Sequence, residues 1–141
     1  IRLQQNDDGE RALRAALLLN PNYLKARLSL FSFLKEKGRH AAALLEGEIL
    51  LQQAAPGPDF YVDLAEICLR GNETDRARKY AEAARKLKDN YARAWLVEAQ
   101  APEILGRPVE AAAAVRACLA ANPDPEIATA ALALRERIDG K

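Results

Sequence analysis

The chain has 141 residues, half of them hydrophobic, and its 21 basic and 20 acidic side chains leave a formal net charge of +1. This length is enough for one domain with its own core, and so small a charge gives nucleic acid or an anionic membrane surface no electrostatic advantage. The longest apolar runs, such as Ala15 to Leu19 and Ala111 to Val115, fall far below the roughly 20 residues of a membrane-spanning helix, so we expect no membrane insertion.

The first element expected along the chain is a helix over residues 8–21, which the segment Asn6 to Gly9 shortens at its start. Ile1 stands where an initiator methionine is usual, and no charged segment followed by an apolar leader comes after it. We therefore expect a piece of a longer protein, and the sequence leaves both cytoplasm and periplasm open.

A period of 34 residues then runs through the chain, with blocks that start at Leu24, Pro58, Ala92 and Glu126. Small or apolar residues fall in the same places of successive blocks. The matching sets are Ala26, Phe60, Ala94 and Ala128; Phe31, Ala65, Ala99 and Ala133; Ala43, Ala77 and Ala111; and Leu50, Ala84 and Cys118. The agreement of several such sets at one spacing indicates a true internal repeat.

Each block reads as two helices joined by a turn. Gly38, the pair Gly71-Asn72 and Gly106 interrupt the apolar periodicity, as glycine and asparagine do just past a helix end. Proline follows Arg107 and Asp124, where the first turn of a helix tolerates it. No stretch alternates with a period of two, so the sequence predicts an all-α chain.

These residues resemble the tetratricopeptide repeat (TPR), a helix-turn-helix unit of 34 residues. The closest match lies in the third full block, at Ala94, Trp95, Ala99, Gly106, Ala111, Cys118 and Pro123. The resemblance implies an α-solenoid of antiparallel helix pairs, wound as a right-handed superhelix. As one domain over residues 1–141, it comprises the second helix of a preceding repeat (8–21), three full repeats (24–57, 58–91 and 92–125) and a C-terminal helix (126–138).

Several positions leave alternatives open. Gly47 and Glu98 depart from the family, which has large apolar residues there. Trp95 either fills the wedge between its own helices and the preceding pair, or contacts a partner. Pro102 either ends or kinks its helix, or splays it and opens a groove. The last helix either caps the array or begins another repeat.

The sequence offers little for catalysis. His40 is the only histidine, Cys68 and Cys118 are isolated and fit buried thiols, and no phosphate-binding or metalloprotease motif occurs. Asp63 and Glu66 could pair as carboxylates but have no companion base or nucleophile. We expect no enzyme, no metal and no cofactor. The basic residues from Arg76 to Lys88 are better explained as a solvated helix face than as a nucleic-acid site.

In this family the first helices of the repeats line the concave face. The resemblance therefore assigns a partner-binding groove to Lys25, Leu28, Ser29, Ser32, Asp59, Val62, Asp63, Glu66, Arg93, Leu96, Val97 and Gln100. Leu28, Val62 and Leu96 form an aliphatic row that either anchors a partner or only seals one first helix against the next.

The family's clamp for a chaperone's C-terminal carboxylate is not matched. Its places hold Leu28, Ser32, Asp63, Arg93 and Val97, of which only Arg93 suits a carboxylate. We expect a non-catalytic scaffold that binds a peptide or an amphipathic helix of another protein in the groove, with no nucleic acid as partner. The alternative is a structural spacer in a longer TPR solenoid attached to an enzyme or to a secretion or export assembly.

Overall fold

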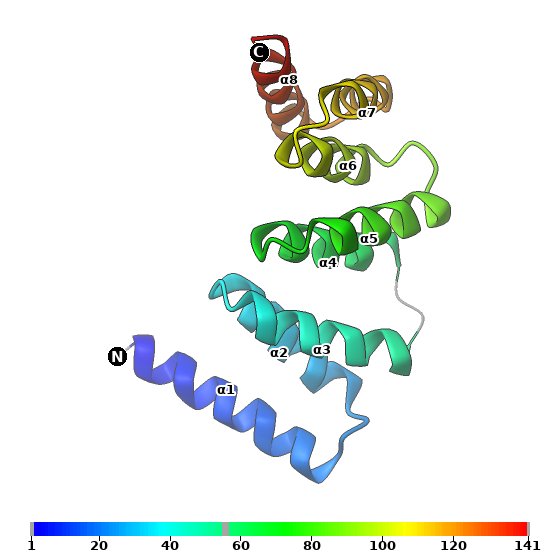
Figure 1. Ribbon diagram of the computed structural model, residues 1–141. Coiled ribbons are helices and arrows are strands. Elements are labelled where there is room, and N and C mark those ends of the chain that lie inside the picture. The colour runs from blue at the N-terminus through cyan, green and yellow to red at the C-terminus, as the bar shows by residue number, and fades with distance from the viewer. Residues whose placement is uncertain (1, 55–56, 141) are drawn as a thin grey trace. The chain divides into compact units, whose positions relative to one another are not determined.

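The computed structural model describes residues 2–54 and 57–140, and every regular element within these ranges is an α-helix. In chain order the helices are α1 (Arg2–Leu19), α2 (Leu24–Glu36), α3 (His40–Gln53), α4 (Pro58–Arg70), α5 (Thr74–Leu87), α6 (Ala92–Ile104), α7 (Pro108–Ala120) and α8 (Pro125–Asp139) (Figure 1). The all-α prediction is confirmed. None of these helices combines the length and the apolar character that crossing a membrane requires.

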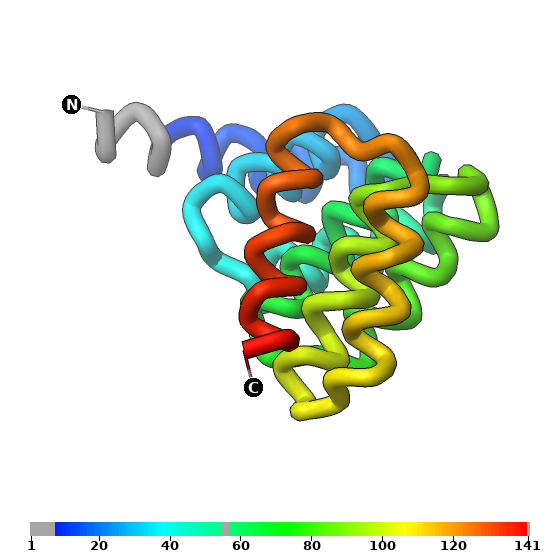
Figure 2. The backbone as a smooth tube through the Cα atoms, turned by 90° about the horizontal axis from the view of Figure 1, so that it is seen from above, coloured from blue at the N-terminus to red at the C-terminus, as the bar shows by residue number. Residues whose placement is uncertain are grey.

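The helices form two compact units, unit 1 over residues 1–56 and unit 2 over residues 57–141. In unit 1, α2 contacts both α1 and α3. In unit 2 each helix contacts the next one, and α6 also contacts α4 and α8. Figure 2 shows α6 and α7 side by side and running in opposite directions. In unit 2 the helix α6 therefore contacts the first helix of the block before it and that of the block after it.

The predicted turns are present in three equivalent places. Gly38, Asn72 and Gly106, spaced by the 34-residue period, adopt positive φ values of 72°, 62° and 72°. After each of them the next backbone N–H donates to the carbonyl five residues earlier, as Arg39 does to Leu34 at 3.0 Å. This is the geometry that closes a helix at a left-handed residue, and it explains why glycine or asparagine recurs there.

The repeated small residues are the ones that the helix pairs bury. Fully buried positions of this kind are Ala43, Ala77 and Ala111 in the second helices, and Ala65 and Ala99 in the first helices. Because an alanine methyl lets two helix axes approach closely, these columns set the spacing within each pair. The unusual Gly47 is buried too, and its equivalent Val115 packs in one cluster with Ala99. Phe31, the equivalent of Ala99, is 2% exposed.

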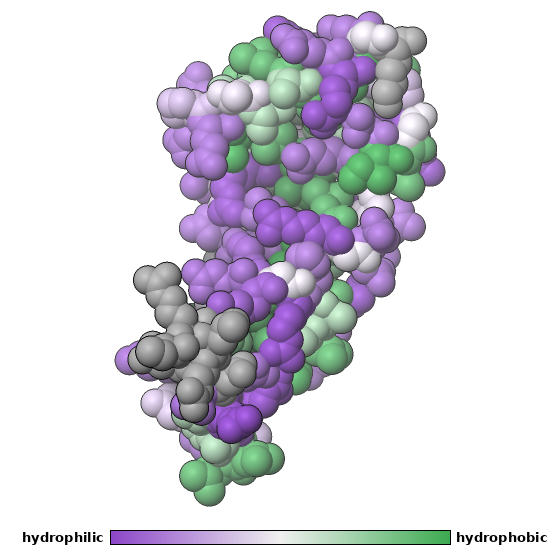
Figure 3. All heavy atoms as spheres, turned by 90° about the vertical axis from the view of Figure 1, so that its left-hand side faces the viewer, coloured by the Kyte–Doolittle hydropathy of each residue, from purple (hydrophilic) through white to green (hydrophobic). Residues whose placement is uncertain are grey.

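The ends of the array differ in detail from expectation. Helix α1 begins at Arg2 and continues through Asn6 to Gly9, because weak helix formers inside a helix lower its stability without ending it. It stops at Leu19, just before the Asn20-Pro21 turn. Leu18 and Leu19 are 85% and 89% exposed, and Figure 3 shows hydrophobic surface at that end of unit 1. The domain boundaries assigned from the sequence stay a prediction.

Pro102 lies inside α6 and is buried, and the helix continues two residues beyond it to Ile104. The carbonyl of Pro102 accepts a hydrogen bond from the Arg107 N–H at 2.7 Å. Proline at this depth removes only one hydrogen bond close to the natural end of the helix. The simpler of the two interpretations, a proline at the end of the helix, agrees with this geometry.

Trp95 and Glu98 are joined by one arginine of the preceding helix. The Arg85 guanidinium lies 3.9 Å from the centre of the Trp95 ring and donates two hydrogen bonds to the Glu98 carboxylate. Trp95 also packs against the buried cluster that contains Ala114 and Val115. The ring thus lies against residues of α5 and α7, and Glu98 forms an ion pair where the family has leucine.

Candidate functional site

The expected groove residues of unit 1 lie together on α2. Lys25, Leu28, Ser29 and Ser32 are all exposed, and Leu28 keeps 48% of its surface accessible. They recur at positions three and four apart, so they share one face of the helix. This face of α2 is exposed and carries an aliphatic residue among polar ones, and its role in binding stays a prediction.

The aliphatic residues expected at the groove of unit 2 are buried instead. Val62 and Val97 are 0% and 1% exposed, and Leu96 is 8% exposed. Leu96 packs with Cys118 and Ala131, on the helices that follow. The second interpretation of the aliphatic row, helix-to-helix packing, therefore holds for these residues. Sequence spacing alone could not separate a lining position from a packing position on the same helix face.

The polar residues of that face form a network between α4 and α6. Arg93 on α6 donates to Glu66 at 2.7 Å and to Asp63 at 3.2 Å, both on α4. The Tyr91 hydroxyl donates to Asp59 and accepts from Arg93 at 3.5 Å. The structure thus brings together the charged groove residues that the sequence placed in two successive blocks.

Burial and hydrogen bonding shift the pKa of two groups in this network, Arg93 and Tyr91. Burial lowers the pKa of Arg93, but Glu66 and Asp63 outweigh it and the pKa is raised overall. Burial, followed by the hydrogen bond to Asp59, raises the pKa of Tyr91 to about 12. At neutral pH the guanidinium is therefore charged and the phenol is neutral, which matches the donors and acceptors in the network.

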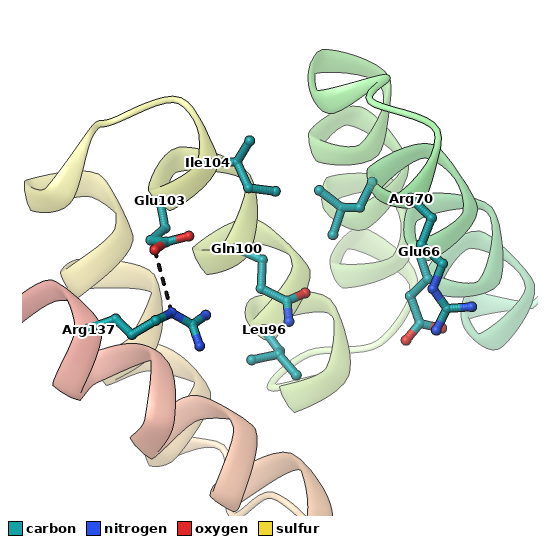
Figure 4. Close-up of a pocket in the computed structure, with 8 residues that line it drawn as sticks. Glu66, Arg70, Leu96, Gln100, Glu103, Ile104 and Arg137 are labelled. Carbon is teal, nitrogen blue, oxygen red and sulfur yellow. Dashed lines mark ion pairs between the residues drawn. The ribbon is translucent and has the colours of Figure 1, made fainter.

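A pocket of about 350 Å³ opens beside this network, between α4, α6 and α8 (Figure 4). Three expected groove residues line it: Glu66, Leu96 and Gln100. Five lining residues were missed from the sequence, namely Leu69, Arg70, Glu103, Ile104 and Arg137. Arg70 and Ile104 lie one helical turn beyond Glu66 and Gln100, so extending the face by four residues would have found them.

The pocket combines an apolar patch with charged walls. Ile104 is 56% exposed and, in Figure 4, lies on the wall that faces Arg70 across the opening. Glu103 and Arg137 form an ion pair at 3.5 Å on the side of α8. Arg70 pairs with no carboxylate among the residues that the structure describes. The pocket can therefore hold an apolar side chain of a ligand against Ile104, while the Arg70 guanidinium donates to polar groups of the same ligand.

The residues considered for chemistry are engaged elsewhere. Asp63 and Glu66 both contact Arg93. Cys68 and Cys118 are free and buried, and burial raises the pKa of the Cys68 thiol to about 11 and that of the Cys118 thiol above its usual value. The prediction of buried thiols is confirmed. Within the described ranges, no cluster of three histidine, cysteine or acidic residues could hold a metal ion.

Solved structures resemble the chain in fold. A structure of MamA superposes with a TM-score of 0.76 at 16% identity, covering 97% of this chain and 88% of that one. YrrB, described as a TPR protein with an unusual peptide-binding site, gives 0.70 at 19% identity, with 99% and 82% covered. TTC0263, a thermophilic TPR protein of Thermus thermophilus, gives 0.69 at 22% identity, with 97% and 79% covered.

The fold is that of a TPR array. The succession of helices α1 to α8 fits such an array. No family model matches the sequence, and no curated protein matches it in sequence. At identities of this size the likeness is one of fold, so function has to be argued from the TPR surface itself.

Proposed function

We propose that this TPR array is a non-catalytic scaffold that binds a peptide or an amphipathic helix of another protein. The observation that carries the proposal is the pocket between α4, α6 and α8, which lies on the face where the sequence placed the groove. Its apolar residues have polar neighbours on both sides, which is the pattern of an anchor site for a protein segment. The peptide-binding site ascribed to YrrB supports the same use of the fold.

The charges of the pocket indicate what such a segment carries. Arg70 is exposed, whereas Arg137 is already paired with Glu103. Ile104 and Leu69 offer the apolar contact. A segment with one aliphatic anchor and an amide group next to it fits both features, because an amide oxygen accepts from a guanidinium without adding a charge. A bare C-terminal carboxylate fits less well, because Glu66 and Glu103 lie on opposite walls of the pocket and repel it.

The test is partner capture from the source cell's lysate with matched surface variants. Ile104→Asp places a charge on the exposed anchor residue, and Arg70→Glu reverses the guanidinium. Leu45→Asp is the control, because Leu45 is a 64% exposed leucine on α3, outside the pocket. Leu96 is unsuitable for this test because its burial makes a folding defect the expected result.

We expect one or more proteins to be captured by the wild type and by Leu45→Asp but lost with both pocket variants, while helical circular dichroism is unchanged. Capture that is equal in all four samples would place the binding site elsewhere. No capture in any sample would favour the spacer function instead.

The spacer function has its own supporting observation. Leu18 and Leu19 on α1 are exposed, and Leu132 on α8 is 40% exposed. Apolar residues on the outer helices of a solenoid are the kind of surface that a neighbouring repeat covers. In that case the chain is one segment of a longer solenoid, attached to an enzyme or to a secretion or export assembly.

A further inference from the structure

A second groove lies on the opposite side of α6 from the pocket just described. It has a volume of about 410 Å³ and runs between α5 and α7. Trp95 and Pro102 of α6 line its floor, and Ala113, Ala114 and Ala117 of α7 line one wall. None of these residues contributes to the pocket between α4, α6 and α8, so the two openings can be changed independently.

The internal repeat explains why this groove is open. Tyr61, one period before Trp95, faces Tyr80 across its helix pair, with ring centres 6.4 Å apart. Two periods before Trp95, Arg27 pairs with Glu46 at 2.6 Å. Tyr80 and Glu46 are the equivalents of Ala114.

A large side chain therefore fills this place in the first two pairs, whereas an alanine stands there in the third pair. Ala114 ends at Cβ and cannot extend over Trp95 as Tyr80 extends over Tyr61. The groove lies beside the tryptophan ring and Ala114, the residue that is equivalent in the repeat to Tyr80.

The charges around the groove are already matched with one another. Arg78 and Glu110 form an ion pair at 3.3 Å from one wall to the other. Arg85 is bound by Glu98 and lies over Trp95, which fixes the indole. A groove whose charges are internally neutralised favours an uncharged occupant, since an added ion would have to compete with these pairs.

The wall formed by α7 admits a close neighbour. Ala113 is exposed and Ala117 is half-buried, and they lie four residues apart on one helix face. Small residues at this spacing let another helix backbone come near while a larger side chain from it enters the groove.

We propose that this groove binds an aromatic side chain of tyrosine size, presented by an uncharged stretch of helix in a partner protein. The occupant takes the place relative to Trp95 that Tyr80 takes relative to Tyr61. The site is independent of the proposed function at the first helices, because no lining residue is shared.

The side-chain part of the proposal is tested with p-cresol, the side-chain analogue of tyrosine, on the full chain. Trp95 is the only tryptophan, so its indole N–H gives a single signal in a nitrogen-15 correlation spectrum. We expect saturable shifts of that signal and of the Ala113 and Ala117 amides. The saturated analogue 4-methylcyclohexanol should bind at least about tenfold more weakly. Equal binding of both analogues, or no saturable shift with either, would overturn the aromatic assignment.

Two variants close the groove in different ways. Ala114→Tyr supplies the missing ring from within, and Ala117→Leu narrows the mouth without touching the buried wall. Ala120→Tyr is the control, because Ala120 is exposed at the end of α7 and does not line the groove. We expect both groove variants to lose at least about tenfold in p-cresol affinity and the control to keep it. Retained affinity in a folded Ala117→Leu protein would contradict the site.

The helix part is tested with an alanine-rich peptide that carries one central tyrosine and with the same peptide interrupted by proline. The helical form should bind more tightly and shift the same three signals. If the interrupted peptide binds equally well, the occupant is an extended segment and the proposed helix is wrong.

Discussion

The two units build the same contact between a first and a second helix from opposite chemistry. In unit 1 the contact is an ion pair, Arg27 with Glu46, whose side chains are only 10% and 13% exposed. In unit 2 it is made by Tyr61 with Tyr80. By comparison, Arg93 of unit 2, which also binds carboxylates, keeps 32% of its side chain exposed. The TPR backbone thus accommodates either an ion pair or an aromatic pair at this position. Because the ion pair is buried, we expect substitution of one of its residues to cost more stability than substitution in the aromatic pair.

Removing one partner of the buried pair should have the largest effect. Glu46→Ala leaves the Arg27 guanidinium in place with its remaining hydrogen bond to the Pro21 carbonyl. An uncompensated buried charge lowers the free energy of unfolding by roughly 3–5 kcal/mol. Urea unfolding measures the loss, and amide hydrogen exchange should locate it in α2 and α3. The double variant Arg27→Met/Glu46→Leu is the control and should recover most of the stability; no recovery would show that packing, and not charge, dominates the site.

Trp95 holds the place in the last helix pair of unit 2 that Arg27 holds in unit 1. Truncating it should lower the free energy of unfolding slightly less than breaking the buried ion pair does. Trp95 is half-buried, packs on the cluster around Val115 and carries Arg85 on its ring. Trp95→Ala should cost about 3 kcal/mol, near the lower end for a large aromatic residue. Hydrogen exchange should show the loss in α6 and α7. Trp95→Phe should cost less than half as much, and equal losses for the two variants would mean that the volume of the ring does not set the cost.

Local rules were enough to predict much of the fold from the sequence. The 34-residue period placed the block starts at Leu24, Pro58 and Ala92, where α2, α4 and α6 begin. The turns followed from glycine and asparagine because only a few residues accept a positive φ. The repeat period and the turn residues both reflect interactions within one helix pair, so a single sequence contains enough information to predict them.

The site was harder to predict because it depends on contacts between helices. Val62 and Leu28 have the same place in the repeat, yet Val62 is buried and Leu28 is half-exposed. Which carboxylates would bind Arg93 depends on how α4 lies against α6. Arg137 entered the pocket from a third helix. A repeat pattern specifies which residues are equivalent, but equivalent residues can have different neighbours.

A buried neutral phenol in unit 2 contrasts with the buried charges of unit 1 and should show itself at high pH. Burial and Asp59 raise the pKa of Tyr91 to about 12, while an unfolded tyrosine titrates near 10. The folded state therefore holds the proton longer. The stabilisation is complete below about pH 10 and is lost as the pH rises toward 12, by up to about 2 kcal/mol.

Urea midpoints of the wild type and of Tyr91→Phe between pH 9 and pH 11.5 measure this effect. Tyr91→Phe removes the titrating group and should show the smaller decline with pH. The half-exposed Tyr23 of unit 1 provides a matched substitution, Tyr23→Phe, outside the network. Parallel curves for wild type and Tyr91→Phe would mean that other groups cause the alkaline loss.

The smallest effects should come from the turns, where the units agree instead of differing. Gly38 of unit 1 and Gly106 of unit 2 both have a φ value of 72°, and Asn72 has 62° at the equivalent position. Gly106→Ala forces a Cβ into the left-handed region and should cost about 1 kcal/mol, although no heavy atom lies within 4 Å of that Cβ. Asn72→Gly relieves the remaining strain, against the larger entropy of an unfolded glycine, and should change stability by less than about 0.5 kcal/mol. Urea unfolding of both variants and of Gly38→Ala checks the ordering, since Gly38→Ala should match Gly106→Ala if the turn, and not its unit, decides the cost.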